Sequence, residues 1–260
     1  MSTMSSVHAA TTLALWAAAR AGGASTDDVL AAVDAAGHRT GVRAASADVA
    51  QTTGLPGPGS PTAGSMALLS LMSGGGIPHL LLPTAGDLRG LPPGGDITVP
   101  ALDAGAVVVF PDKEIGVVPT DGHWRVHRCP GQHRALTLTE ANLEIDGAMA
   151  DATRTLVAID IARGSDQVRE HVRRRMLDEA VDLPDGTPTA ASALLAKVIS
   201  LEALLAVAAG HETAAVTSRE LAVVDDALRP LNTAVRAGRR AAVGEAARVL
   251  SSQSVSRSRR

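Results

Sequence analysis

The residues best suited to hold a ligand are Gly86, Asp87, Arg89 and Gly90, in the loop that follows the apolar run 77–82. Glycines let a ligand approach the backbone closely, the Arg89 guanidinium can hold a carboxylate or phosphate, and Asp87 can accept a hydroxyl or serve as a base. Ligands of α/β sheets usually bind beyond the carboxyl ends of buried strands. The pattern predicts an anion-binding loop, with a surface loop organised by Asp87 and Arg89 as the alternative.

A second group has side chains of metal-ligand type within a short stretch: His123, His127, Cys129 and His133. In a strand the first three share a face, because successive side chains alternate. Trp124 and Val126 then occupy the opposite face and belong to the core, which leaves His123, Arg125 and His127 facing solvent. The spacing is wider than in zinc sites and arginines lie among these residues, so we expect no metal here.

Arginine is concentrated near the end of the chain, where residues 229–260 hold eight Arg against one acid, Glu245. A second basic cluster comprises Arg169, Arg173, Arg174 and Arg175. Such stretches can bind nucleic acid or an acidic partner. Aromatic stacking residues are absent there, however, and the whole chain has a net charge of -3. We therefore interpret them as solvated helix faces and do not expect nucleic acid as a partner.

Motifs for established chemistries are absent. The chain has no G-x-S-x-G, P-loop, dinucleotide-binding glycine motif, H-E-x-x-H or paired C-x-x-C. The sequence therefore assigns no catalytic residue and leaves the cofactor unknown. An enzyme whose site is assembled from scattered residues stays open.

The elements that position these residues begin with a small sheet. Short apolar runs bounded by turn residues predict strands at 77–82, 106–110, 115–118 and 123–127, with a further short strand at 41–44. Residues 111–114 and 120–122 are short enough for hairpin turns, so the last three strands form an antiparallel meander. Residues 45–61, rich in Pro and Gly towards their end, have the composition of a loop.

From residue 139 onwards the periodicity predicts helices. Thr139 is the expected cap of a long helix whose apolar positions form one narrow stripe: Ile145, Met149, Ala152, Leu156 and Ile159. Residues 190–209 are apolar nearly all round, as at the centre of a bundle. Pro230 is expected to kink or split the last helix. The predicted class is α/β (α+β), with a small α/β domain at 1–136, a helical bundle at 139–250 and a disordered basic tail at 251–260.

Composition favours a soluble cytoplasmic protein. Aromatic residues make up 1% of the chain, so the core must consist of Leu, Val, Ile and Ala. Cys129 is the only cysteine, which excludes an intrachain disulfide and suits a reducing compartment. Lys197 and Glu202 interrupt the most hydrophobic run, so no membrane span is expected.

Parts of the chain resemble uncharacterised proteins of high-GC actinobacteria. The resemblance lies in residues 80–92, 101–105, 115–119 and 124–126, within a stretch of about 50 residues. It supports a lineage and a compartment and implies no activity.

Two hypotheses of function follow. The first is an interaction or regulatory protein that self-associates as a dimer through helical stripes such as 145–159, with a protein partner. The alternative is a small-molecule-binding protein or enzyme acting on an anionic ligand at Gly86, Asp87, Arg89 and Gly90.

Overall fold

The chain forms two compact units. The computed structural model describes residues 5–37, 41–74, 76–88, 90–92, 94–131, 136–158, 166–210 and 218–257. The N-terminal unit comprises Met1–Arg134, Val181–Pro188 and Val243–Arg260, and the C-terminal unit comprises Ala135–Ala180 and Thr189–Ala242. Two later segments of the chain therefore belong to the N-terminal unit, so the two units are not separated at a single residue.

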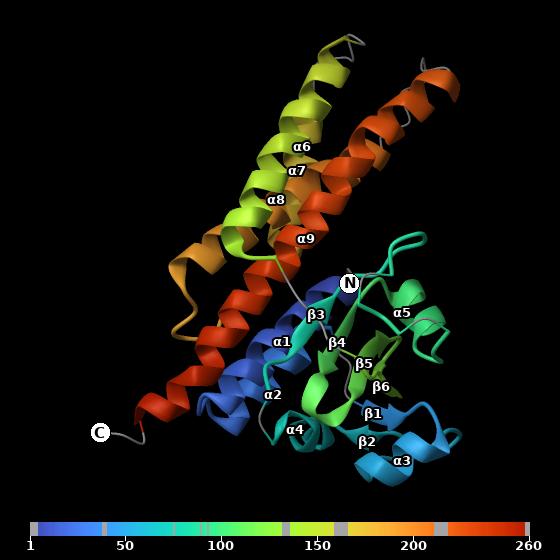
Figure 1. Ribbon diagram of the computed structural model, residues 1–260, viewed down its shortest axis with the longest axis vertical. Helices are drawn as coiled ribbons and strands as arrows, with labels where there is room; N and C mark the ends of the chain where they lie inside the picture. The colour runs from blue at the N-terminus through green and yellow to red at the C-terminus, as the bar shows by residue number, and fades with distance from the viewer. Residues whose placement is uncertain are drawn as a thin grey trace. The chain divides into compact units, whose positions relative to one another are not determined.

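One six-stranded mixed sheet organises the N-terminal unit (Figure 1). Its strands are β1 (Gly41–Ala44), β2 (Ala63–Gly64), β3 (His79–Leu81), β4 (Val107–Phe110), β5 (Ile115–Thr120) and β6 (His123–Arg128), in the order β2-β1-β6-β5-β4-β3. Strands β3 to β6 pair antiparallel, whereas β1 pairs parallel with β6. The sheet, its helices and the helical C-terminal region confirm the predicted α/β class, and β4, β5 and β6 form the predicted meander.

Helices cover the two faces of this sheet unequally. On one face, α1 (Ser6–Ala21) packs on β3, β4 and β5, while α3 (Ala47–Thr53) packs on β1 and β6. On the other, α5 (Thr98–Ala104) packs on β5, and Figure 1 shows α1 and α5 on opposite sides of the strands. Three further short elements belong to the unit, together with the last part of the final helix: α2 (Thr26–Ala35), α4 (Met66–Met72) and the 3-10 turn Pro111–Lys113.

The helix α3 corrects the sequence-based prediction of a loop at 45–61. Ser46 is its N-cap, with the hydroxyl accepting from the backbone N–H of Val49 at 3.2 Å. Gly54 ends the helix in the left-handed conformation at φ 71°. The dense Pro and Gly residues begin only after this stop, so the composition of the whole stretch concealed seven helical residues.

The C-terminal unit consists of helices. These are α6 (Leu138–Ala158), α7 (Asp166–Asp178), α8 (Thr189–Gly210) and part of α9 (Ser218–Arg257). Thr137, not Thr139, caps α6, since Thr137 and Glu140 bond reciprocally as a capping box. Gly238 lets α9 approach closely, because a Cβ there would lie 2.6 Å from Ile145 Cδ1 and 3.0 Å from Val198 Cγ2.

Pro230 lies inside α9 and does not split it, which excludes one of the two expected effects of this proline. The last helix differs from its prediction at its end, because it continues to Arg257, through seven residues for which the composition predicted disorder. Residues 258–260 lie outside the described part of the chain.

The two charged residues of α8 are paired with neighbouring helices. Lys197 Nζ lies 2.7 Å from an Asp146 oxygen on α6. Arg239 on α9 is fully buried, and its guanidinium donates to both oxygens of Glu202, with Nε 3.0 Å from Oε1. Among the described residues, one segment, Thr189–Ala209 of α8, is long and apolar enough to cross a membrane. Core helices have the same composition, so this is weak evidence for a span.

We predict that Glu202→Leu lowers the free energy of unfolding by about 3 kcal/mol, because it leaves the buried Arg239 guanidinium without its carboxylate. The double variant Glu202→Leu/Arg239→Met should recover most of this loss. Urea denaturation measures both values. Asp146→Ala is the matched control, because the exposed pair with Lys197 contributes at most about 1 kcal/mol. Equal losses in Glu202→Leu and Asp146→Ala would contradict the assignment.

Candidate functional site

The β5–β6 hairpin separates the apolar from the polar side chains of β6. Trp124 and Val126 are fully buried on the face covered by α1 and α3, as the alternation predicted. His123, Arg125 and His127 share the other face. Of these three, His123 and Arg125 are half-buried, but His127 is only 4% exposed, so the prediction that it faces solvent is wrong.

Burial of His127 follows from the cover on its own face. Its register partner on β5 is Gly116, and a Cβ at Gly116 would lie 2.4 Å from Ile97 Cδ1, at the start of α5. Leu91, Ile97 and Cys129 belong to the apolar cluster on this side of the sheet. The apolar cluster thus covers this face over β3 to β5, and the polar side chains of the face lie on β6 and β1.

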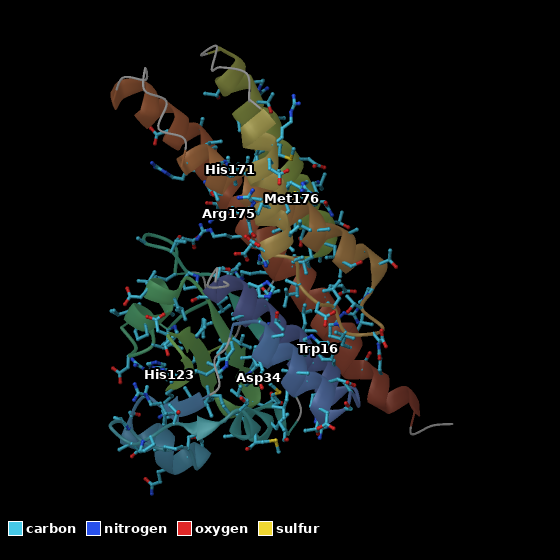
Figure 2. The ribbon with its side chains drawn as sticks, turned by 180° about the vertical axis from the view of Figure 1, so that it is seen from behind. Trp16, Asp34, His123, His171, Arg175 and Met176 are labelled. Carbon is cyan, nitrogen blue, oxygen red and sulfur yellow. The ribbon has the colours of Figure 1, made fainter. Side chains whose placement is uncertain are left out.

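The strand β1 adds a second arginine to this face. In the parallel register Arg43 lies directly opposite Arg125, and Gly41 opposite His123. Both arginine residues are half-buried, and neither makes an ion pair with a carboxylate of the described residues. We call Arg43, His123, Arg125 and His127 the basic sheet face; His123 is labelled in Figure 2.

Like charges directly opposite each other on neighbouring strands destabilise a sheet. Here the arginine charges also change the pKa of a neighbouring histidine. Burial lowers the pKa of His123, and the charges of Arg43 and Arg125 lower it further, partly offset by the hydrogen bond to the Asp121 carbonyl and the Asp121 charge. The repulsion between Arg43 and Arg125 is unfavourable for the fold, and a bound anion would reduce it.

Three of the four ring nitrogens of His123 and His127 are buried without a hydrogen-bond partner among the described residues. Nδ1 of His123 lies 3.0 Å from the Asp121 carbonyl oxygen, which can only accept, so Nδ1 carries the proton of the neutral ring. The three nitrogens without a partner are Nε2 of this ring and both ring nitrogens of His127. Buried polar atoms of this kind are rare in folded proteins.

The predicted ligand-binding loop lies on the same side of the sheet. Thr84 and Asp87 exchange two backbone hydrogen bonds, of 3.1 and 2.9 Å, around a tight turn in which Gly86 has φ 81°. Leu88 packs against the apolar cluster, Gly90 is exposed with φ 91°, and Arg89 lies outside the described residues. The strand before this loop, β3, is an antiparallel edge strand, so the rule for parallel sheets does not apply to it. Binding at Gly86, Asp87, Arg89 and Gly90 stays a prediction.

The metal-ligand types of this region do not meet in one site among the described residues. Within that part of the chain no group of three or more His, Cys, Asp or Glu could hold a metal ion. Cys129 is buried, and burial raises the pKa of its thiol to about 11. His133 lies outside the described residues.

Sequence comparison places the chain among known relatives. The profile of the Rv1486c-like protein, N-terminal domain, matches residues 10–138, and that of the C-terminal domain matches residues 139–240. The chain belongs to the Rv1486c-like family. This confirms the resemblance to uncharacterised actinobacterial proteins.

Relatives in the Rv1486c-like family match along nearly their whole length. The uncharacterised protein Rv1486c of Mycobacterium tuberculosis is 28% identical, and the uncharacterised protein MAV321 of Mycobacterium avium is 30% identical. The uncharacterised protein ML1804 of Mycobacterium leprae is 26% identical. Each alignment covers 89% of this chain and 94% of the relative. No solved structure matches the chain. The names of these relatives state no activity, so the chemistry must be argued from the site.

Sequence reasoning placed His123, Arg125 and His127 on one face of a strand but assigned that face to solvent and not to a site, and it missed Arg43. The alternation of β6 contained the signal for the first three. Arg43 is remote in sequence and joins them only through the parallel pairing of β1 with β6.

We predict that the protein loses stability as the pH falls from about 6.5 to about 4. Burial first, and then the charge of Arg125, lower the pKa of His127 from 6.5 to about 4, against the opposing charge of Asp96. Between these values the unfolded chain binds a proton that the folded protein excludes, so the free energy of unfolding falls by about 2–3 kcal/mol. Urea denaturation across this pH range measures the change.

His127→Leu is the comparison variant, because it removes the titrating ring and its two unpartnered nitrogens. We expect it to flatten this part of the pH profile and to be at least as stable as the parent at pH 7. An unchanged pH dependence in His127→Leu would assign the acid sensitivity to other groups.

Proposed function

We propose that this protein binds a small anionic molecule at the basic sheet face and works as a ligand-binding protein of the cytoplasm. The observation that carries the proposal is the opposition of Arg43 and Arg125 in adjacent strands, with no ion pair from either to a carboxylate of the described residues. Two half-buried arginines side by side suit a phosphate or carboxylate group, which each can bind through two parallel hydrogen bonds.

The histidines add hydrogen bonds to this charge. With Nδ1 of His123 held by the Asp121 carbonyl, Nε2 is the nitrogen left for a ligand, and an anion beside it favours the protonated, donating form. The neutral ring of His127 offers one donor and one acceptor. The arrangement supports binding of an anion; it supplies no nucleophile activated by a base, so we propose no reaction.

The cytoplasmic part of the proposal rests on the single, buried Cys129. The anionic ligand agrees with the chemistry predicted for the loop of Asp87 and Arg89, which lies on the same side of the sheet. The proposal moves the centre of binding from that loop to the strands.

Binding is tested with inorganic phosphate and malonate, which present the two candidate anionic groups. We expect at least one of them to raise the pKa of His123, followed by NMR of the imidazole signals, and to stabilise the protein against heat. Arg43→Gln and Arg125→Gln should each weaken binding about tenfold or more, the loss expected for hydrogen bonds to a charged group.

Arg128→Gln is the matched control, because Arg128 lies on the same strand with its side chain on the opposite face, beside Glu114. It should bind like the parent. Without anion, Arg125→Gln should be slightly more stable than the parent, since a like-charge pair is removed. A failure of both anions to act, or equal binding in Arg125→Gln and the parent, would refute the proposal.

Self-association is the second candidate function. Ile145 and Ala152 of the predicted stripe are buried within the C-terminal unit, and Leu156 and Ile159 have side chains outside the described part. What supports an interface is the exposure of other large apolar residues in that unit, among them Leu143 at 68%, Leu177 at 64% and Leu204 at 48%.

We predict a concentration-dependent dimer in sedimentation velocity that Leu143→Glu or Leu204→Glu shifts towards monomer, because a buried charge without a partner opposes association. Val99→Glu, at an exposed apolar position of the N-terminal unit, is the control. A monomer at all accessible concentrations would remove this candidate.

A further inference from the structure

A cavity of the N-terminal unit lies away from the basic sheet face. It has a volume of about 650 Å³ and is bordered by α1, α2, the segment around Asp182 and the last turns of α9. This volume falls within the range of about 300–1,000 Å³ that small-molecule sites occupy. Trp16, labelled on α1 in Figure 2, lines the cavity and is one of three aromatic residues in the whole chain.

The walls of the cavity are tied together by contacts between remote segments. Trp16 Nε1 donates to the backbone carbonyl of Asp182 at 3.1 Å, and Gln253 Nε2 donates to the Gly186 carbonyl at 3.3 Å. Gly22 lies so close to α9 that a Cβ would be 2.1 Å from the Leu250 carbonyl oxygen. These contacts fix the indole and the walls before any ligand arrives, which lowers the entropic cost of binding.

The charged side chains that line the cavity all have one sign. Asp28, Asp182 and Asp185 line it, and no Lys, Arg or His is among the described residues that do so. The C-terminal end of α1 also borders it, but Arg20 in the last turn of α1 offsets the partial negative charge there, as Asp28 in the first turn offsets the positive end of α2. An anion is therefore repelled and a cation attracted.

The rest of the lining comprises Gln253, Gly22 and Gly23 together with apolar side chains: alanines of α1 and α2, Ala24, Leu183, Pro184 and Leu250. A metal ion or a bare ammonium would leave this surface unused. A cation attached to an apolar stem contacts it and also meets Trp16, whose indole attracts ammonium and guanidinium groups.

We propose that this cavity binds an organic cation, an ammonium or guanidinium group on an apolar stem. The carboxylates of Asp28, Asp182 and Asp185 attract the cationic group, Trp16 contacts it, and the alanine and leucine walls hold the stem. The site is separate from the basic sheet face and takes a ligand of opposite charge.

The chain has only two tryptophans, so protein labelled with 5-fluorotryptophan gives two fluorine NMR signals. Trp16→Phe assigns them. Three probes of similar size and different charge are titrated: butylguanidinium, neutral pentanamide and anionic pentanoate. We expect butylguanidinium alone to shift the Trp16 signal saturably, while the signal of the buried Trp124 stays in place as an internal reference.

Substitution of Asp by Asn then removes the negative charge of each acid at the cavity and keeps the shape of the side chain. Asp28→Asn, Asp182→Asn and Asp185→Asn should each weaken binding of butylguanidinium about two- to fivefold, and the triple variant about tenfold or more. The Asp182 substitution keeps the backbone carbonyl that holds Trp16. Asp121→Asn, outside the cavity in the same unit, is the control and should bind like the parent.

The proposal is overturned if pentanamide or pentanoate shifts the Trp16 signal as strongly as butylguanidinium, if the triple variant binds like the parent, or if no probe shifts that signal. Phosphate and malonate should leave the Trp16 signal unmoved. The result is therefore independent of whether the basic sheet face binds its anion.

Discussion

The antiparallel pairing of β5 with β6 is the constraint on which the N-terminal unit depends. Its register runs over six residue pairs, from Ile115 opposite Arg128 to Thr120 opposite His123. A slip by one residue would turn Trp124 and Val126 to the polar face and bury Arg125 in their place. Since Trp124 fills the core beneath α1 and α3, that alternative is excluded, and the arginine and histidines of β6 are held on the other face.

The same pairing explains which parts of the molecule could be predicted from sequence. Short β-branched runs with turn residues between them identified β4, β5 and β6, and alternation assigned Trp124 and Arg125 to opposite faces. Local signals of this kind depend on neighbours in the chain. The parallel pairing of β1 with β6 joins segments that are remote in sequence, so local signals could not predict that Arg43 lies opposite Arg125. The burial of His127 was missed for a similar reason, because Ile97 and the segment before α5 cover it from elsewhere in the sequence.

Two regions of one unit present opposite charges on different structural bases. The basic sheet face uses side chains fixed by strand register, with little freedom to turn away from one another. The acidic cavity uses carboxylates on a helix end and a loop, and its rigidity comes from the contacts of Trp16, Gln253 and Gly22 with remote segments. The net charge of -3 reveals neither the basic face nor the acidic cavity. It sums the charges of the whole chain, whereas a ligand interacts with the local charge of one surface.

A comparison of Arg239 with Arg43 and Arg125 gives the strongest reason to regard the basic sheet face as a candidate site. Arg239 is fully buried in the C-terminal unit, and Glu202 supplies both carboxylate oxygens to it. Arg43 and Arg125 are half-buried and opposed, and no described carboxylate pairs with either. A carboxylate near them would stabilise the fold, as Glu202 does for Arg239, and would also occupy the place of a ligand. No carboxylate of the described residues takes that place, which lowers stability and, in the proposed function, leaves both arginines to bind an anion.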